Sequence, residues 1–276
     1  MDSKTAKQLI ADFGLTPNKA LGQNFLIDDT AVDKIVRIAL KGCGDNTDII
    51  EIGAGLGNLT LALCKEANKV VTVEIDTELK PLLKAQLFGI KNSSLIYNDF
   101  LKADICNIIE AFELTQPVTI VSNLPYALTA KILNKLFINH RLIKRAVLMM
   151  QSEVAKKLQS PPGLKTYRPI SVLCQSLCEV NEIFTLSPSQ FYPQPAVLST
   201  VLCLDFTKSC PAWDIDIKSF SGFLTYLFNN RRKTLQSALK GSRYADLQKL
   251  SSLPENLRIE TLNSQKLVSL YKNLFF

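Results

Sequence analysis

Metal-binding residues are scarce in this sequence of 276 residues. His140 is the only histidine, and the seven cysteines are scattered without a CxxC pair. Cys174 and Cys178 are four residues apart, as on one face of a helix, but two thiols alone do not complete a zinc site. We therefore expect reduced, mostly buried thiols and no metal centre.

Long hydrophobic runs are also missing. No stretch approaches the 18 consecutive apolar residues that indicate a transmembrane helix. The N-terminal MDSKTAKQLIADFGL lacks the apolar core of a signal peptide and has the pattern of a short amphipathic helix. We expect a cytoplasmic protein without a membrane partner.

Positive charge is concentrated near the C-terminus. The formal net charge is +7, and residues 207–276 hold eleven Lys and Arg residues against five Asp and Glu residues. This skew favours a polyanionic partner, nucleic acid first, over a basic surface with no such role.

Strand-like and helix-like patterns alternate through the first two thirds of the chain. Because the strand-like runs are continuously apolar, they predict a parallel sheet buried on both faces, in a doubly wound, Rossmann-like α/β domain. After residue 206 only helical spacing follows, so we place one domain at 1–206 and a small helical domain at 207–276. Residues 170–180 fit a helix or a strand equally well. The predicted strands are 47–53, 69–75, 93–98, 117–123, 145–151 and 199–206, and the predicted helices are 58–66, 78–87, 104–112, 129–137 and 152–159.

A glycine loop, EIGAGLG, follows the first of these strands. Gly53 and Gly55 allow the tight turn and the close approach of backbone to a ligand. The spacing is GxGxG, and Asn58 stands where the dinucleotide fingerprint GxGxxG requires glycine. Alone, the loop is a weak signal, because glycine-rich turns after strands also serve only to make room for packing.

Acidic residues follow the next two strands. Glu74 ends the second, where a carboxylate can accept hydrogen bonds from ribose hydroxyls, and Asp99 follows the third, where it can accept from an adenine amine. The alternative roles are helix capping and solvated strand-end charge. Because neither a P-loop nor an arginine grips a pyrophosphate, we expect an adenosine-type cofactor, S-adenosylmethionine first.

The segment SNLPY ends the fourth strand on the same rim. The side-chain oxygen of Asn123 and a nearby carbonyl, that of Leu124, can accept both N–H bonds of an exocyclic adenine amine. Pro125 fixes the turn, and Tyr126 can stack on the base. A proline turn with a half-buried tyrosine is the alternative.

These motifs and others identify a resemblance to the rRNA adenine N6-dimethyltransferases, especially the small-subunit type, over nearly the whole chain. The other segments that carry it, in the family's order, are LGQNFLID (21–28), NDFLK (98–102), MMQSEVAKKL (149–158), FYPQPAVLSTV (191–201) and LFNNRRKTLQSALK (227–240).

The resemblance implies a class I S-adenosylmethionine-dependent methyltransferase fold, with residues 1–27 as an N-terminal arm. It places the cofactor against Asn24, Leu26, Gly53, Glu74, Asp99 and Asn123. It places the target adenine against Asn123, Leu124, Pro125 and Tyr126, with Phe191 on the other face of the flipped base.

The implied reaction is four methyl transfers to two adjacent adenosines in a hairpin loop near the 3′ end of small-subunit rRNA, within the immature 30S subunit. We expect a monomer whose basic helical domain docks on that subunit. Arg231, Arg232 and Lys233 are candidates for phosphate contacts, and a solvated helix face is the alternative.

Two positions depart from the family's pattern. Ala127 replaces the usual Asn, and Ala196 the usual Lys, which puts local RNA contacts in doubt. A large-subunit erythromycin-resistance type of methyltransferase, or a non-catalytic ribosome-assembly factor on the same scaffold, stays open. A nicotinamide-dependent oxidoreductase is disfavoured by GxGxG and by the lack of a catalytic histidine.

Overall fold

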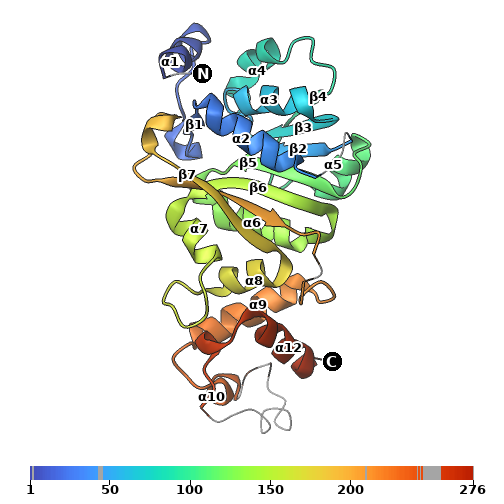
Figure 1. Ribbon diagram of the computed structural model, residues 1–276, viewed down its shortest axis with the longest axis vertical. Coiled ribbons are helices and arrows are strands. Elements are labelled where there is room, and N and C mark those ends of the chain that lie inside the picture. Colours follow the sequence, from blue (N-terminus) through green and yellow to red (C-terminus); the bar gives the residue numbers. More distant parts are fainter. Residues whose placement is uncertain are drawn as a thin grey trace. The chain divides into compact units, whose positions relative to one another are not determined.

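The chain forms two compact units in the computed structural model (Figure 1), which describes residues 1, 3–42, 46–208, 210–240, 242, 244 and 256–275. The first unit comprises Met1–Ala155 and Asn181–Asp205, and the second comprises Lys156–Val180 and Phe206–Phe276. The break at Asp205 lies one residue from the predicted boundary. Lys156–Val180, which the sequence-based division assigns to the first domain, belong to the second unit.

A seven-stranded sheet with the order β4-β3-β2-β5-β6-β9-β7 forms the centre of the first unit. The pairs β2–β3, β3–β4, β2–β5 and β5–β6 are parallel, and β9 runs antiparallel to β6. This confirms the predicted Rossmann-like sheet. Its strands are β2 (Asp48–Ile52), β3 (Lys69–Glu74), β4 (Ser93–Tyr97), β5 (Val118–Asn123), β6 (Ile143–Gln151), β7 (Glu179–Leu186) and β9 (Ser199–Asp205).

The strand order reverses beside β2. The chain moves outward from β2 through β3 to β4 and then returns to pair β5 with the other edge of β2. In open parallel sheets, ligands bind at the carboxyl ends of the strands at such a switch point. The residues that follow β2, β3, β4 and β5 therefore meet at one end of the sheet.

Both faces of the sheet are buried at its central strands β2, β3 and β5, which explains their continuous apolar runs. Val121 and Val147 point into a core cluster with α2 and α3, whereas their neighbours Ile120 and Leu148 are buried on the opposite face. Helices form where the apolar spacing predicted them, with short 3-10 turns at several ends. The helices of this unit are α1 (Ser3–Asp12), α2 (Asp29–Leu40), α3 (Asn58–Glu66), α4 (Lys80–Gln86), α5 (Ile105–Ala111) and α6 (Thr129–Ile138), and α7 (Ser152–Leu158) crosses into the second unit; the 3-10 turns are η1 (Lys19–Leu21), η2 (Thr77–Leu79), η3 (Tyr126–Leu128), η4 (His140–Leu142) and η5 (Pro188–Gln190).

Three elements have no counterpart among the predictions: helix α2, strand β7, and a two-stranded sheet. That small sheet pairs β1 (Phe25–Leu26) with β8 (Phe191–Tyr192) antiparallel, so that Leu26 lies opposite Phe191. Strands of two residues carry no detectable period, and their partners are far apart in sequence. This pairing nevertheless brings two of the segments that carry the family resemblance side by side.

The second unit is helical in its described part. The ambiguous residues 170–180 form most of α8 (Pro169–Leu177) and the start of β7. Aromatic rings fill the core, and Phe223 contacts Tyr244, Tyr271 and Phe275 with centroids 5.3, 5.4 and 6.0 Å away. The other helical elements of the second unit are α9 (Ile217–Asn229), α10 (Leu235–Leu239), η6 (Ile259–Thr261) and α12 (Ser264–Phe275).

Among the described residues of both units, no helix is long and apolar enough to cross a membrane.

One carboxyl group is fully buried in the sheet. Glu51 of β2 accepts hydrogen bonds from the hydroxyls of Thr60 (2.6 Å) and Thr72 (2.8 Å), both at Oε2. No described residue donates to its Oε1. Burial raises the pKa of Glu51 to about 7, against the lowering effect of the two hydroxyls.

This raised pKa predicts a pH-dependent stability. Folding favours the protonated form, so the contribution of Glu51 is complete below about pH 4.5 and is lost as the pH rises through about 7. We expect Glu51→Gln to gain stability relative to the unmodified protein across this window, by on the order of 3 kcal/mol. Urea unfolding followed between pH 4.5 and 8 measures the difference. The exposed Glu66→Gln is the control, and a Glu51→Gln difference that stays constant with pH contradicts the assignment.

Candidate active site

A pocket opens at the switch point of the sheet. It encloses about 1000 Å³, part of which is open to solvent, enough for a nucleoside-sized ligand. Ten of the eleven residues expected to contact the cofactor or the target base line it, and Phe191 does not. The lining consists of residues 21–26, 52–56, 58, 59, 73–75, 98–101, 123–126, 128 and 132.

The glycine loop forms the floor of the pocket between β2 and α3. Gly53, Gly55 and Gly57 have φ values of +80°, +56° and +84°, a region in which other residues are strained. A Cβ on Gly53 would meet no atom within 4 Å, so the loop leaves open space there for a ligand. At Gly55, by contrast, a Cβ would lie 2.9 Å from Cδ1 of Phe25. The loop is therefore open at one glycine and tightly packed at the next.

Glu74 holds the glycine loop as well as facing the pocket. Its Oε2 accepts a hydrogen bond from the backbone N–H of Gly55 (3.1 Å), and its Oε1 accepts from that of Asp76 (2.9 Å). Burial raises the pKa of Glu74, while these two backbone N–H groups act to lower it. Since each carboxylate oxygen can accept more than one bond, Glu74 can still receive ribose hydroxyls.

One carboxylate oxygen of Asp99 is hydrogen-bonded within the fold, and the other is available to a ligand in the pocket. Oδ1 accepts from the backbone N–H of Leu101 (2.9 Å) and closes a tight turn after β4. No described residue donates to Oδ2. The ring of Phe100, next along the chain, is buried and lines the pocket. The turn thus presents a carboxylate oxygen beside an aromatic ring.

Asn24 connects the N-terminal arm to the end of β5. The side-chain Nδ2 of Asn123 donates to the backbone carbonyl of Asn24 at 2.8 Å. Because a carbonyl only accepts, the amide nitrogen must face it, and the Asn123 Oδ1 then lies on the other side of the amide. Gln23 donates to Asp76 Oδ2 (2.6 Å) and Asn58 to the Leu26 carbonyl, which ties the same arm to the rim.

The NLPY segment continues from β5 into a 3-10 turn. Leu124 is buried, and its N–H donates to the Met149 carbonyl (2.9 Å), which fixes the backbone at this point. No hydrogen bond from a described residue engages the Leu124 carbonyl. The Tyr126 hydroxyl is 2.7 Å from Oγ of the buried Ser199 in β9. The Tyr126 ring is partly buried, which raises the pKa of its hydroxyl, while the hydrogen bond with Ser199 acts to lower it.

Phe191 lies outside the pocket. It is 1% exposed and packs in the core cluster with Val32, Ile35 and Leu186. The sequence-based expectation that Phe191 sandwiches a flipped base is therefore not met in this conformation, because its β8 pairing with Leu26 turns the ring into the core. Stacking on a ligand would require this side chain to leave that core.

Ser199 and Asn58 are polar groups of the site that sequence reasoning missed. Ser199 lies within the FYPQPAVLSTV segment, yet nothing in its pattern shows that its hydroxyl reaches Tyr126. Asn58 was noted only as a departure from GxGxxG. Its bond to the Leu26 carbonyl shows why an amide suits that position better than a glycine.

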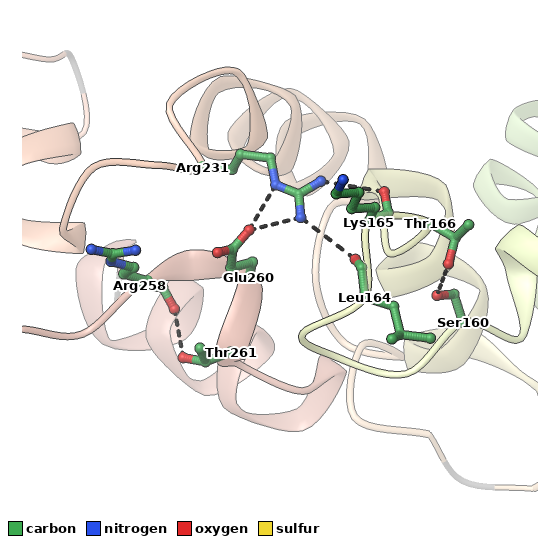
Figure 2. A network of polar contacts seen from close by, with 8 residues as sticks. All are labelled: Ser160, Leu164, Lys165, Thr166, Arg231, Arg258, Glu260 and Thr261. Carbon is green, nitrogen blue, oxygen red and sulfur yellow. Dashed lines mark hydrogen bonds and ion pairs between the residues drawn. The ribbon is translucent and has the colours of Figure 1, made fainter.

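In the second unit, the guanidinium of Arg231 is engaged by an acidic side chain and two backbone carbonyls (Figure 2), and the side chain is 18% exposed. Nε and Nη2 donate to Oε2 of Glu260 at 2.8 and 2.7 Å. Nη2 also reaches the Leu164 carbonyl at 3.5 Å, and Nη1 reaches the Lys165 carbonyl at 3.4 Å. These contacts tie the turn after α9 to residues 164–165 and η6, and they occupy the guanidinium that the sequence suggested for a phosphate contact. Arg232 and Lys233 are exposed.

The parallel sheet, with a pocket and acidic residues at its switch point, forms the Rossmann-like fold of the class I methyltransferases. A family model described as ribosomal RNA adenine dimethylase matches residues 14–274, and the chain belongs to this family.

Relatives in this family are similar over nearly the whole chain. Proteins named ribosomal RNA small subunit methyltransferase A share 35% identity in Clostridium acetobutylicum, over 100% of both chains, and 36% in Mycoplasma mobile, over 94% of this chain and 96% of the relative. Two solved structures share the fold. A dimethyladenosine transferase from Plasmodium falciparum has a TM-score of 0.74 (23% identity, 90% and 98% coverage), and the 23S rRNA methyltransferase ErmE has 0.67 (22%, 91% and 99%).

The glycine loop provides a direct test of the pocket. Gly55→Ala adds a Cβ against Phe25 at a positive φ, so the loop must shift. We expect affinity for S-adenosylhomocysteine to fall by about tenfold or more, as measured by calorimetry, with a loss of about 1–3 kcal/mol in stability. Gly89→Ala is the matched control, because Gly89 has φ +80°, no neighbour within 4 Å and no place in the pocket. Equal affinities in the two variants would exclude a cofactor role for the loop.

Proposed function

We propose that this chain transfers methyl groups from S-adenosylmethionine to N6 of adenosines in small-subunit rRNA. The observation that carries the proposal is the Asn123 amide, which is oriented by the Asn24 carbonyl at the pocket that also holds Glu74 and Asp99. Membership of the rRNA adenine dimethylase family supports the reaction. The relatives' name supports small-subunit rRNA as the substrate.

The cofactor half of the pocket fits an adenosyl group. Asp99 Oδ2 and the Phe100 ring suit the amine and the face of adenine, and Glu74 suits the ribose hydroxyls. The open space above Gly53 suits a ligand that approaches the backbone closely. When bound, S-adenosylmethionine supplies a methyl group already activated by its sulfonium.

The target half of the pocket prepares a weak nucleophile. The N6 lone pair of adenine is delocalised into the ring, and two acceptors on its N–H bonds favour a more pyramidal nitrogen. Asn123 Oδ1 and the Leu124 carbonyl are those acceptors, and Tyr126 stacks on the base, a contact worth roughly 1–3 kcal/mol. As the new N–C bond forms and the C–S bond breaks, the electron pair stays on sulfur and one N6 proton leaves to solvent.

The finer proposal concerns the target. We propose two adjacent adenosines in the 3′-terminal hairpin loop, each methylated twice, within an immature 30S subunit and by a monomer. Bases in such loops are splayed out at low energetic cost, which suits a pocket that must receive a flipped base. A ribosomal substrate also agrees with the cytoplasmic location expected from the sequence.

Mass mapping of rRNA tests this function. Incubation of the protein and S-adenosylmethionine with undermethylated small subunits should add four methyl groups to two adjacent adenosines, whereas large subunits should stay unmodified. Asn123→Ala should lower the rate by about a hundredfold or more, because an acceptor for the reacting amine is lost. The exposed Asn134→Ala is the control.

Methylation of the large subunit would favour the erythromycin-resistance type of activity. Binding to small subunits without methylation would favour a non-catalytic assembly factor. Full activity of Asn123→Ala would contradict the role of its side chain while leaving the reaction standing.

The second unit provides a separate prediction about RNA binding. Neutralising Arg232 and Lys233 together should reduce the slope of log affinity for small subunits against log salt by about 1.5, because two phosphate contacts are lost. Arg231→Gln should instead lower thermal stability, since Glu260 Oε2 then loses the two charged N–H donors that it accepts from. Binding measured at several salt concentrations checks the first, and thermal unfolding the second. An unchanged slope means that Arg232 and Lys233 only form a solvated face.

A further inference from the structure

The turn after β4 forms one wall of the pocket. Residues 98–101 line the pocket, and they include Asp99 and Phe100. The backbone N–H groups of Lys102 and Ala103 both donate to the Asp99 carbonyl, at 2.9 and 3.0 Å. Internal bonds thus shape the turn, but they leave the carbonyls of Leu101 and Ala103 to be satisfied from outside.

Lys135 of α6 supplies that outside contact. Its Nζ donates to the Leu101 carbonyl at 3.1 Å and also to the Ala103 carbonyl, and it lies 5.1 Å from the centroid of the Phe100 ring. No described carboxylate lies within ion-pair distance of this ammonium. Burial lowers the pKa of Lys135, and the charges of Asp104 and Asp99 act to raise it. The cation is therefore held by two backbone dipoles and an aromatic face.

We infer that Lys135 is a positioning residue of the cofactor site. Its contacts fix residues 98–103 against α6 and so hold Phe100 and Asp99 at the pocket wall. The inference rests on the proposed function for the identity of the ligand. The Lys135 ammonium contacts three groups of this one turn: two backbone carbonyls and the Phe100 ring. An ion pair does not account for the orientation of the side chain toward the turn. Its effect is exerted through Phe100 and Asp99.

The expected energetic consequence is a loss of preorganisation. Without the ammonium, two carbonyls of the turn need water and the Phe100 ring loses its cationic partner. The turn then occupies the binding-competent arrangement for a smaller fraction of the time, and apparent affinity falls in proportion to that fraction. The loss should be the same for every ligand that carries an adenosine, since Asp99 and Phe100 face that part of the pocket.

Lys135→Met and Lys131→Met form a matched pair. Lys131 lies one turn earlier on the same helix and is exposed, so both variants lose one positive charge from α6. Calorimetry should show Lys135→Met binding S-adenosylhomocysteine about tenfold more weakly, and adenosine weaker by the same factor. Lys131→Met should match the unmodified protein. Lys135→Arg, which keeps the donors and the cation, should recover most of the affinity.

Steady-state methylation separates positioning from general damage. For Lys135→Met, KM for S-adenosylmethionine should rise about tenfold, while kcat at saturating cofactor stays within about twofold. Equal cofactor affinity in Lys135→Met and Lys131→Met overturns the inference, and so does a loss in Lys135→Met that falls on kcat alone. If the unmodified protein binds no S-adenosylhomocysteine, the proposed function itself fails, which is a distinct result.

Discussion

The return of the chain from β4 to β5 is the constraint on which the site depends. This crossover places β5 beside β2, so that the segments after four parallel strands open at one end of the sheet. The glycine loop, Glu74, Asp99 and Asn123 are separated by up to 70 residues, and only this topology brings them together. Each of them lies at or directly after the end of a strand, and β2, β3 and β5 are buried on both faces, which restricts the positions of these groups before any ligand binds.

Several polar side chains of the site use one atom for the fold and offer another to a ligand. Asn123 anchors Nδ2 on the Asn24 carbonyl and leaves Oδ1, and Asp99 uses Oδ1 in its turn and leaves Oδ2. The Tyr126 hydroxyl is bonded to Ser199, which leaves the ring face. The hydrogen bond to the fold restricts each of these side chains to one orientation. Little side-chain conformational entropy is therefore lost when a ligand binds.

The sequence predicted the parallel sheet and the strand-end residues well, because both follow from local patterns. Apolar runs mark buried strands, and the end of a strand fixes the rim to which Glu74 and Asn123 belong. Long-range contacts could not be read in this way. Phe191 has the sequence context of a base-stacking residue, yet its pairing across β1 and β8 buries it. Arg231 has the context of a phosphate ligand, but Glu260 engages it, and that partner is 29 residues away.

The pocket lining contains no histidine, which agrees with a site that acts through orientation of its ligands. The only histidine, His140, is 3% exposed, does not line the pocket, and contacts the Phe137 carbonyl through Nδ1. Glu51, the carboxyl group whose pKa lies near neutrality, is buried beneath the glycine loop rather than facing the pocket. A reaction whose methyl donor is already activated gains most from orientation of the nucleophile. Fixed acceptors at Asn123 and Leu124 supply that orientation, and the proton released from the amine can pass to water through the open side of the pocket.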